Sequence, residues 1–413
     1  MSEWVNIKLG DILEIIRNGS SNIQIQKFTN YPVTRIETIS YCKIDFLKVG
    51  FVEKIDEKYK LKYGDLLLSN INSLKHIGKI AFYDSKKTLY HGMNLLLLRF
   101  YSNYSSKFIY YLLVFKKNWF EKNACQAVNQ ASINQATIKK FEIYIPKSKT
   151  EQDKIADILS TIDAAIEKTE AIIKKYERIK TGLMQDLLTK GIDEHGNIRS
   201  EQTHEFKDSP LGRIPKEWEN LKMKNICSVS QGLQIAIEKR FSEYSTNRFL
   251  YITLQFLKEP DRYLYYIENP PINVIFNKED ILFTRTGNTG QIITDITGVY
   301  HNNFFKIDYN KNMILKNYLV FFLNWEVIQN LIKDLAGTTT IPDLKHNDFY
   351  SLPILFPKCL KEQMRIINFL NTNSKIINYN KGMLEKLQKL KTGLMQDLLT
   401  GHVPVDSLLK ENG

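Results

Sequence analysis

The sequence has 413 residues and a mass of 48.3 kDa, which is too long for one ordinary compact core and indicates two or three domains. Its 43% hydrophobic residues, with only 19 glycines and 11 prolines, exclude a disordered or fibrous chain. The 57 basic and 45 acidic side chains give a net charge of +12, and a positive surface attracts phosphate groups, so nucleic acid is the leading candidate partner. Charge alone leaves this open, because many basic proteins bind no nucleic acid.

The positive charge is concentrated near the beginning of the chain. Residues 1–150 carry 23 basic and 12 acidic side chains, whereas residues 201–361 carry 19 and 18. The closest two of the four cysteines, Cys42 and Cys125, are 83 residues apart, which excludes the short spacings of zinc and redox motifs. No apolar run approaches the roughly 18 residues that a membrane span needs. We therefore expect a cytoplasmic protein with reduced thiols and no membrane contact.

Residues 1–146 are predicted to form a first domain of mixed α+β class. Short apolar runs predict strands at residues 80–83 and 95–100, and residues 107–115 suit a helix. Amide and hydroxyl side chains in loops can read base edges, and lysines can meet phosphates. On this basis the candidate DNA-binding residues of the domain are Ser69, Asn70, Asn72, Lys75 and Lys79, followed by Asn129, Gln130 and Ser132. For each of them a merely solvated loop remains the alternative.

Residues 147–200 are predicted to contain a long helix over residues 151–190. Its heptad pattern places Ile155, Ile162, Thr169, Tyr176 and Leu183 at one core position, and Ile158, Ala165, Ile172 and Ile179 at the other. A helix of this size is about 60 Å long, which is typical of a rod and not of a core helix.

Residues 201–357 are predicted to form a second α+β domain. Strands are expected at residues 281–284 and 292–294, and a helix at residues 318–328. The loop that follows the first of these strands matches the polar loop of the first domain. The candidate DNA-binding residues here are Arg285, Thr286, Asn288 and Gln291, followed by Thr339 and Thr340 near Asp343.

Residues 358–413 are predicted to contain a second long helix over residues 362–400, in the same heptad frame. The ten residues Lys-Thr-Gly-Leu-Met-Gln-Asp-Leu-Leu-Thr occur at 180–189 and again at 391–400, an offset of 211. The same offset pairs Pro146 with Pro357, and Glu151-Gln152 with Glu362-Gln363. The chain is therefore an internal repeat of a divergent domain and a nearly invariant helix.

Two related helices with one apolar seam each most simply bury those seams against one another, as an antiparallel coiled coil about a pseudo-two-fold axis. Gly191 and Gly401 are expected to end the helices. The alternative is that each helix packs on its own domain.

The identical segments carry polar residues that an apolar seam does not need, which indicates that one kind of partner docks twice. The candidate partner-binding residues are Thr181, Gly182, Gln185 and Asp186 and their copies Thr392, Gly393, Gln396 and Asp397. A recent duplication without a selected surface is the alternative.

The sequence contains no recognisable catalytic or metal-binding motif. Residues 269–272, Asn-Pro-Pro-Ile, resemble an amino-methyltransferase motif but lack its aromatic residue, and residues 287–290 lack the Lys-Ser/Thr ending of a phosphate-binding loop. The seven histidines show no spacing of four residues for a metal. We expect no catalytic residue, no metal and no cofactor on this chain.

The two lead-ins at Pro146 and Pro357, the repeated ten residues and the Ile214-Pro215-Lys216-Glu217-Trp218 start of the second half resemble the specificity (S) subunits of type I restriction-modification systems. The resemblance covers essentially the whole chain. It implies two target-recognition domains that read the halves of a bipartite double-stranded DNA site, and helices that set the spacer and bind two modification (methyltransferase) subunits. It also implies restriction subunits, with S-adenosylmethionine, ATP and Mg on these partners. A stand-alone DNA methyltransferase or nuclease, and a structural coiled-coil scaffold, are the alternatives.

Overall fold

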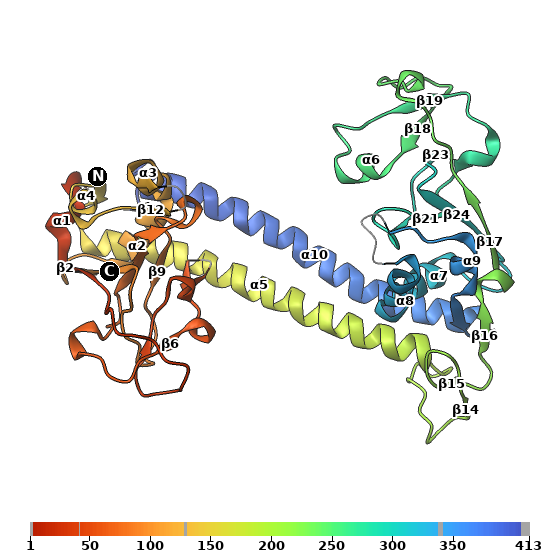
Figure 1. Cartoon of the computed structure of the whole chain (residues 1–413), viewed down its shortest axis with the longest axis horizontal. Coiled ribbons are helices and arrows are strands. Elements are labelled where there is room, and N and C mark those ends of the chain that lie inside the picture. Colours follow the sequence, from red (N-terminus) through yellow and green to blue (C-terminus); the bar gives the residue numbers. More distant parts are fainter. Residues whose placement is uncertain (1–2, 41, 128–129, 338–341, 406–413) are drawn as a thin grey trace. The chain divides into compact units, whose positions relative to one another are not determined.

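The structure is a computed structural model that describes residues 3–40, 42–127, 130–337 and 342–405. The chain divides into two compact units: unit 1 comprises residues 1–171 and 381–413, and unit 2 comprises residues 172–380. Each unit contains one domain of mixed helix and sheet together with parts of two long helices, α5 (Lys149–Thr189) and α10 (Leu360–Leu399) (Figure 1). The predicted α+β class and the two long helices are confirmed.

Unit 1 is built around an antiparallel sheet with the strand order β2-β10-β7-β9. A small sheet has the order β11-β12-β8, and three strand pairs are β1-β13, β3-β6 and β4-β5. The strands are β1 (Trp4–Lys8), β2 (Leu13–Asn18), β3 (Pro32–Val33), β4 (Ile39–Ser40), β5 (Lys43–Ile44), β6 (Gly50–Phe51), β7 (Leu66–Ser69), β8 (Ile71–Asn72), β9 (Ile80–Phe82), β10 (Leu95–Phe100), β11 (Cys125–Ala127), β12 (Gln130–Ser132) and β13 (Glu142–Pro146). The short helices are α1 (Leu9–Ile12), α2 (Ser106–Phe115), α3 (Lys117–Asn123) and α4 (Gln135–Lys139).

Unit 2 repeats this plan, with a central sheet β17-β24-β21-β22 and a second sheet β19-β18-β23-β20. The strands are β14 (Phe206–Lys207), β15 (Ile214–Pro215), β16 (Glu219–Lys222), β17 (Cys227–Gln231), β18 (Arg248–Ile252), β19 (Tyr266–Glu268), β20 (Ile275–Phe276), β21 (Ile281–Thr284), β22 (Ile292–Ile293), β23 (Gly298–Tyr300), β24 (Phe304–Tyr309) and β25 (Pro353–Phe356). The short helices are α6 (Leu254–Lys258), α7 (Lys316–Leu323), α8 (Glu326–Ala336) and α9 (His346–Ser351).

The first four residues of β10 are all leucines because both faces of the strand are buried there. In β10, Leu96 and Leu98 belong to the main core of unit 1, while Leu95 and Leu97 belong to a separate cluster on the other face. Side chains alternate between the faces of a strand, so a strand between two apolar clusters needs apolar residues at every position. This explains why strands were predictable from short apolar runs.

One predicted helix is wrong in its extent. Residues 318–328 do not form a single helix, because α7 ends at Leu323 and α8 begins at Glu326. The turn between them brings Trp325, which is only 3% exposed, into the core of unit 2. Apolar periodicity alone does not distinguish one helix from two short helices joined by a two-residue turn.

The long helices contribute to the core of each unit. In unit 1, the first part of α5 and the last part of α10 share the core, and Nζ of Lys391 forms a salt bridge of 2.6 Å with Asp163. In unit 2, Leu187 and Leu188 of α5 share the core with Ile366 and Leu370 of α10. Inside each unit the two helices therefore pair in opposite chain directions. A continuous coiled coil remains a prediction.

The buried face of the helices differs from the predicted seam. The first predicted column is buried at positions such as Ile155 and Ile366, but the second column is not: Phe369 is 47% exposed and Leu390 is 52% exposed. The helices bury the next residues instead, Leu159, Ile173, Leu370 and Ile377. Both columns are apolar in the sequence, so the heptad pattern did not determine which one faces the neighbouring helix.

Each long helix ends beside a tryptophan that lies near the start of a domain. Gly191 and Gly401 have positive φ angles of 63° and 75°, which confirms the predicted helix ends. A β-carbon at Gly191 would lie 2.4 Å from Cζ2 of Trp218, and one at Gly401 would lie 3.2 Å from the ring of Trp4. Among the described residues, no helix combines the length and the apolarity required to cross a membrane.

Candidate nucleic-acid interface and docking surface

The candidate residues after β7 divide into a buried pair and an exposed group. Ser69 and Asn70 are only 1% and 6% exposed. The Ser69 hydroxyl accepts a hydrogen bond of 3.2 Å from Nδ2 of Asn72, and Nδ2 of Asn70 donates to the carbonyl of Ile133 at 3.5 Å. These contacts give Ser69 and Asn70 a role in holding the loop, whereas Asn72 is half-exposed.

The small sheet of unit 1 brings two candidate groups together. β8 pairs with β12, so Asn72 lies opposite Ala131, and the neighbouring Gln130 and Ser132 are exposed. These residues are almost 60 positions apart in the sequence, and their proximity was not predicted. Asn129 lies outside the described residues.

Lysine side chains surround His76 beside this sheet. The pKa of His76 is lowered first by desolvation and then by the positive charges of Lys79, Lys75 and Lys117. Lys117 also donates to the carbonyl of Lys75 at 3.4 Å. Lys117 was missed in the sequence because it begins α3, 42 positions after Lys75. Nζ of Lys117 is paired with Glu121 at 2.7 Å, so Lys75 and Lys79 supply the local positive surface of the kind that meets phosphates.

In unit 2, Arg285 is held by a carboxylate. Its Nε and Nη2 atoms donate to Asp343 at 2.8 to 3.1 Å, and the Thr286 hydroxyl donates to the same carboxylate. Burial raises the pKa of Asp343, but the hydrogen bonds from Thr286 and Arg285 and the charge of Arg285 outweigh it and lower that pKa overall. Any base contact by Arg285 would have to share the guanidinium with Asp343, and its role in DNA binding stays a prediction.

The remaining candidates of unit 2 lie on the same loop. Nδ2 of Asn288 donates to Oε1 of Gln291 at 3.0 Å, and both side chains are exposed. The loop is tied to the segment before α9, since the amide of Gly287 donates to the carbonyl of Pro342 at 3.0 Å. Thr339 and Thr340 lie outside the described residues.

The two units present their candidate loops in the same way. In unit 1 the amide of Ile133 donates to the carbonyl of Asn70 at 2.9 Å, and in unit 2 the amide of Leu344 donates to the carbonyl of Arg285 at 2.8 Å. In both units this bond joins the loop after a central strand to the segment before a short helix. The internal repeat therefore extends to the candidate sites.

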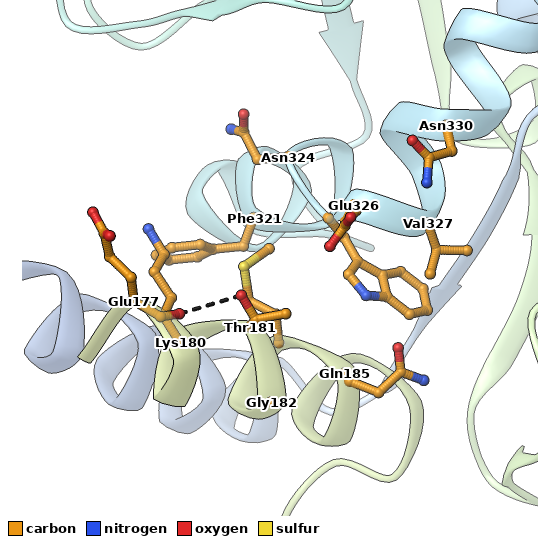
Figure 2. A pocket seen from close by; sticks show the side chains of 12 residues that line it. Glu177, Lys180, Thr181, Gly182, Gln185, Phe321, Asn324, Glu326, Val327 and Asn330 are labelled. Atoms are coloured by element: carbon orange, nitrogen blue, oxygen red, sulfur yellow. Dashed lines mark hydrogen bonds between the residues drawn. The ribbon is translucent and has the colours of Figure 1, made fainter. Parts of the chain in front are cut away.

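The candidate docking residues of α5 line a groove of about 790 Å³ within unit 2. Thr181, Gly182 and Gln185 form one side, and residues of α7, of α8 and of the turn between them, including Phe321 and Val327, form the other (Figure 2). Asp186 is not part of the lining; its carboxylate accepts a hydrogen bond of 2.8 Å from Lys190. In unit 1, the copies Thr392, Gly393, Gln396 and Asp397 are exposed on α10.

Packing among the described residues does not require glycine at position 182 or 393. A β-carbon at Gly182 or Gly393 would meet no atom within 4 Å. Glycine in the middle of a helix costs about 1 kcal/mol relative to alanine. A second groove in unit 2, lined by Leu183, Phe369 and Ile376, opens between α5 and α10. Both helices thus leave an apolar column and a small-residue position available to another molecule.

The described residues hold no cluster of three or more histidine, cysteine, aspartate or glutamate side chains suited to a metal. The Asn-Pro-Pro-Ile segment places Ile272 in a short 3-10 turn, 87% exposed to solvent.

The chain matches one family along most of its length. The family model for the type I restriction modification DNA specificity domain matches residues 1–178 and 215–389. The chain is 35% identical to the putative type I restriction enzyme MjaX specificity subunit of Methanocaldococcus jannaschii, over 98% of this chain and 94% of that protein. The MjaVIII specificity subunit of the same organism is 23% identical with the same coverage. The crystal structure of a type I restriction-modification S subunit from M. genitalium has the same fold, with a TM-score of 0.64, 16% identity and 96% of both chains covered.

Proposed function

The chain belongs to the family of type I restriction-modification DNA specificity subunits, and from this premise we propose that it recognises a bipartite double-stranded DNA site and catalyses no reaction itself. The observation that carries the proposal is the repetition of the candidate loop in both units. One carbonyl, that of Asn70 or Arg285, anchors each loop to the segment before a short helix. Two loops on one repeated framework suit two half-sites with different bases.

Each unit supplies a different balance of contacts. The lysine cluster of unit 1 neutralises phosphates and positions the DNA, while exposed amides such as Asn72 and Gln130 reach base edges. Unit 2 has no comparable charge excess, so its contacts rely more on neutral polar groups.

Two modification subunits dock on the repeated helix segments, one at each copy, and restriction subunits join through them. The support is the groove above Gly182, the unused space at Gly182 and Gly393, and the exposed apolar column that includes Phe369 and Leu390. S-adenosylmethionine, ATP and Mg belong to these partners, which carry out the chemistry in the cytoplasm. By analogy with the family, an adenine is flipped out of the DNA into the modification subunit.

The experiment is genome-wide mapping of methylated positions in cells that carry the chain with its partner subunits. Exchange of residues 1–146 for those of a relative is expected to change one half of the methylated motif only. A seven-residue insertion in α5, matched by one in α10, is expected to lengthen the unspecified gap and leave both halves unchanged. A seven-residue insertion at residues 203–204, in the linker between α5 and β14, is the control and is expected to alter nothing.

Two experimental results would contradict the proposal. A domain exchange that changed both halves together would exclude two separate readers. Methyl transfer by the purified chain with S-adenosylmethionine alone would show that the chain is itself an enzyme.

A further inference from the structure

A tight turn in unit 2 brings its own amide side chain together with those at the end of β17 and in the segment that follows it. The turn comprises residues 301–303, between β23 and β24. The end of β17 approaches it closely: a β-carbon at Gly232 would lie only 2.1 Å from the carbonyl oxygen of Tyr300, so only glycine fits there. The amide of Arg285 donates to the carbonyl of Asn303 at 2.8 Å, which ties the candidate loop to the same turn.

The side chains at this turn form a connected set. Nε2 of Gln231 donates to the carbonyl of Asn302 at 2.9 Å, and Nδ2 of Asn302 donates to Oε1 of Gln234 at 3.3 Å. Gln231 and Gln234 are exposed, as are Asn288 and Gln291 on the neighbouring loop. Among the described residues these bonds leave Oε1 of Gln231 and the amino group of Gln234 without a hydrogen-bond partner.

Resting on the proposed function, we infer that the exposed carboxamides of Gln231 and Gln234, which are held by Asn302, read adenine-containing base pairs in the half-site of unit 2. A carboxamide offers one donor and one acceptor side by side, which matches N7 and the N6 amino group of adenine in the major groove. Gln231 is held by the backbone of the turn and Gln234 by the side chain of Asn302, so this arrangement exists before DNA binds.

The equivalent turn of unit 1 has different chemistry. Register places Asn18 where unit 2 has Gln231, since Asn18 lies opposite Leu96 of β10 and Gln231 lies opposite Phe305 of β24. In the same alignment Met93, which is 48% exposed, stands in place of Asn302. The amide set is therefore particular to unit 2, as expected of residues that distinguish two half-sites.

The charge distribution agrees with this role. Residues 201–361 carry 19 basic and 18 acidic side chains, so unit 2 gains little from general attraction to phosphates. Arg285, the charged residue among the candidate DNA-binding residues of unit 2, already forms a salt bridge of 2.8 Å with Asp343. Neutral amides can specify bases without adding to salt-dependent affinity.

The test is selection of bound sequences from randomised duplexes by the full chain assembled with its modification subunits. In Gln231→Ala/Gln234→Ala, adenine preference is expected to fall by about tenfold at one or two positions of one half-site. The other half and the slope of affinity against salt are expected to stay unchanged. Gln255→Ala, at an exposed glutamine of α6 in the same unit, is the matched control and is expected to have no effect.

A second variant protects the test against a folding defect. Gln234→Glu keeps the shape of the side chain but leaves only acceptors, so it is expected to move preference from adenine towards cytosine. Unchanged preference in both variants, with discrimination in both halves intact, overturns the inference and leaves the proposed function standing. Absence of discrimination in the unaltered complex overturns the proposed function as well.

Discussion

Gln152 and Gln363 occupy equivalent positions at the start of the long helices, and each connects its helix to a domain. Both side chains are fully buried. Oε1 of Gln152 accepts from the amide of Ser105 at 2.8 Å, and Oε1 of Gln363 accepts from the amide of Leu315 at 2.8 Å. Each also donates from Nε2 to the carbonyl of the proline that precedes its helix.

The neighbouring glutamates hold the tryptophans. Nε1 of Trp4 donates to Glu151, and Nε1 of Trp218 donates to Glu362, both at 3.2 Å. The Glu-Gln pair was recognisable in the sequence as a repeated motif. Its role was not, because its partners inside the domains are 47 to 147 positions away in the chain.

For these single residues, we expect Gln363→Ala to lower the free energy of unfolding by about 3 kcal/mol. The substitution leaves the Leu315 amide and the Met313 and Pro357 carbonyls without their partner in a buried site. Gln388→Ala, at an exposed glutamine of the same helix, is expected to change it by less than about 0.5 kcal/mol. Urea unfolding of the full chain measures both, and equal losses would show that the buried carboxamide is not a structural bond.

Among the elements, the long helices were the most predictable and their faces the least. Identical ten-residue segments and a sustained heptad pattern located α5 and α10 to within two residues of their ends. The choice between Phe369 and Leu370 as the core position depended on the neighbouring helix, which the sequence pattern does not describe. The exposed apolar column, which includes Phe369 and Leu390, is available for docking together with the predicted docking residues.

For the long helices, Gly182→Ala is expected to affect the stability of the chain and the binding of a modification subunit in opposite directions. Alanine meets no atom of the chain and favours the helix, so the free energy of unfolding is expected to rise by about 0.5 to 1 kcal/mol. The added methyl group is expected to weaken binding of a modification subunit, measured by titration calorimetry. Gly382→Ala has equally open surroundings on α10 and is expected to stabilise the chain without affecting binding. Equal binding by the two variants would place the docking surface elsewhere.

Over the whole molecule, the repeat predicted the architecture and the charge count predicted an asymmetry. The repeat of a domain and a long helix followed from an offset of 211 residues, whereas the α+β class followed from short apolar runs and the helix ends from Gly191 and Gly401. The candidate sites were predictable only as separate loops. Their assembly depends on pairings such as β8 with β12, and on the close approach at Gly232, which no local pattern reveals.

For the whole molecule, we expect the salt dependence of DNA affinity to come mainly from unit 1. Lys75→Gln/Lys79→Gln is expected to reduce the slope of log affinity against log salt by about 2, because each phosphate contact contributes about 0.9. Lys333→Gln/Lys345→Gln, at two exposed lysines of unit 2, is the matched control and is expected to reduce the slope by less. Filter binding over a salt series gives both slopes, and a larger effect in unit 2 would contradict the asymmetry.

The two joints between a helix end and a domain differ in one respect. Gly191 meets Trp218 with the chain running on from one to the other, whereas Gly401 meets Trp4 without any such connection. Because the chain is continuous there, the linker takes part in the joint of unit 2: both Nη atoms of Arg199 and the amide of Ile192 donate to the buried carboxylate of Glu362. An exchange of the recognition domain of unit 2 therefore has to keep Arg199 together with the leading tryptophan, the buried glutamate and the terminal glycine, whereas the rest of the linker is free to vary in length.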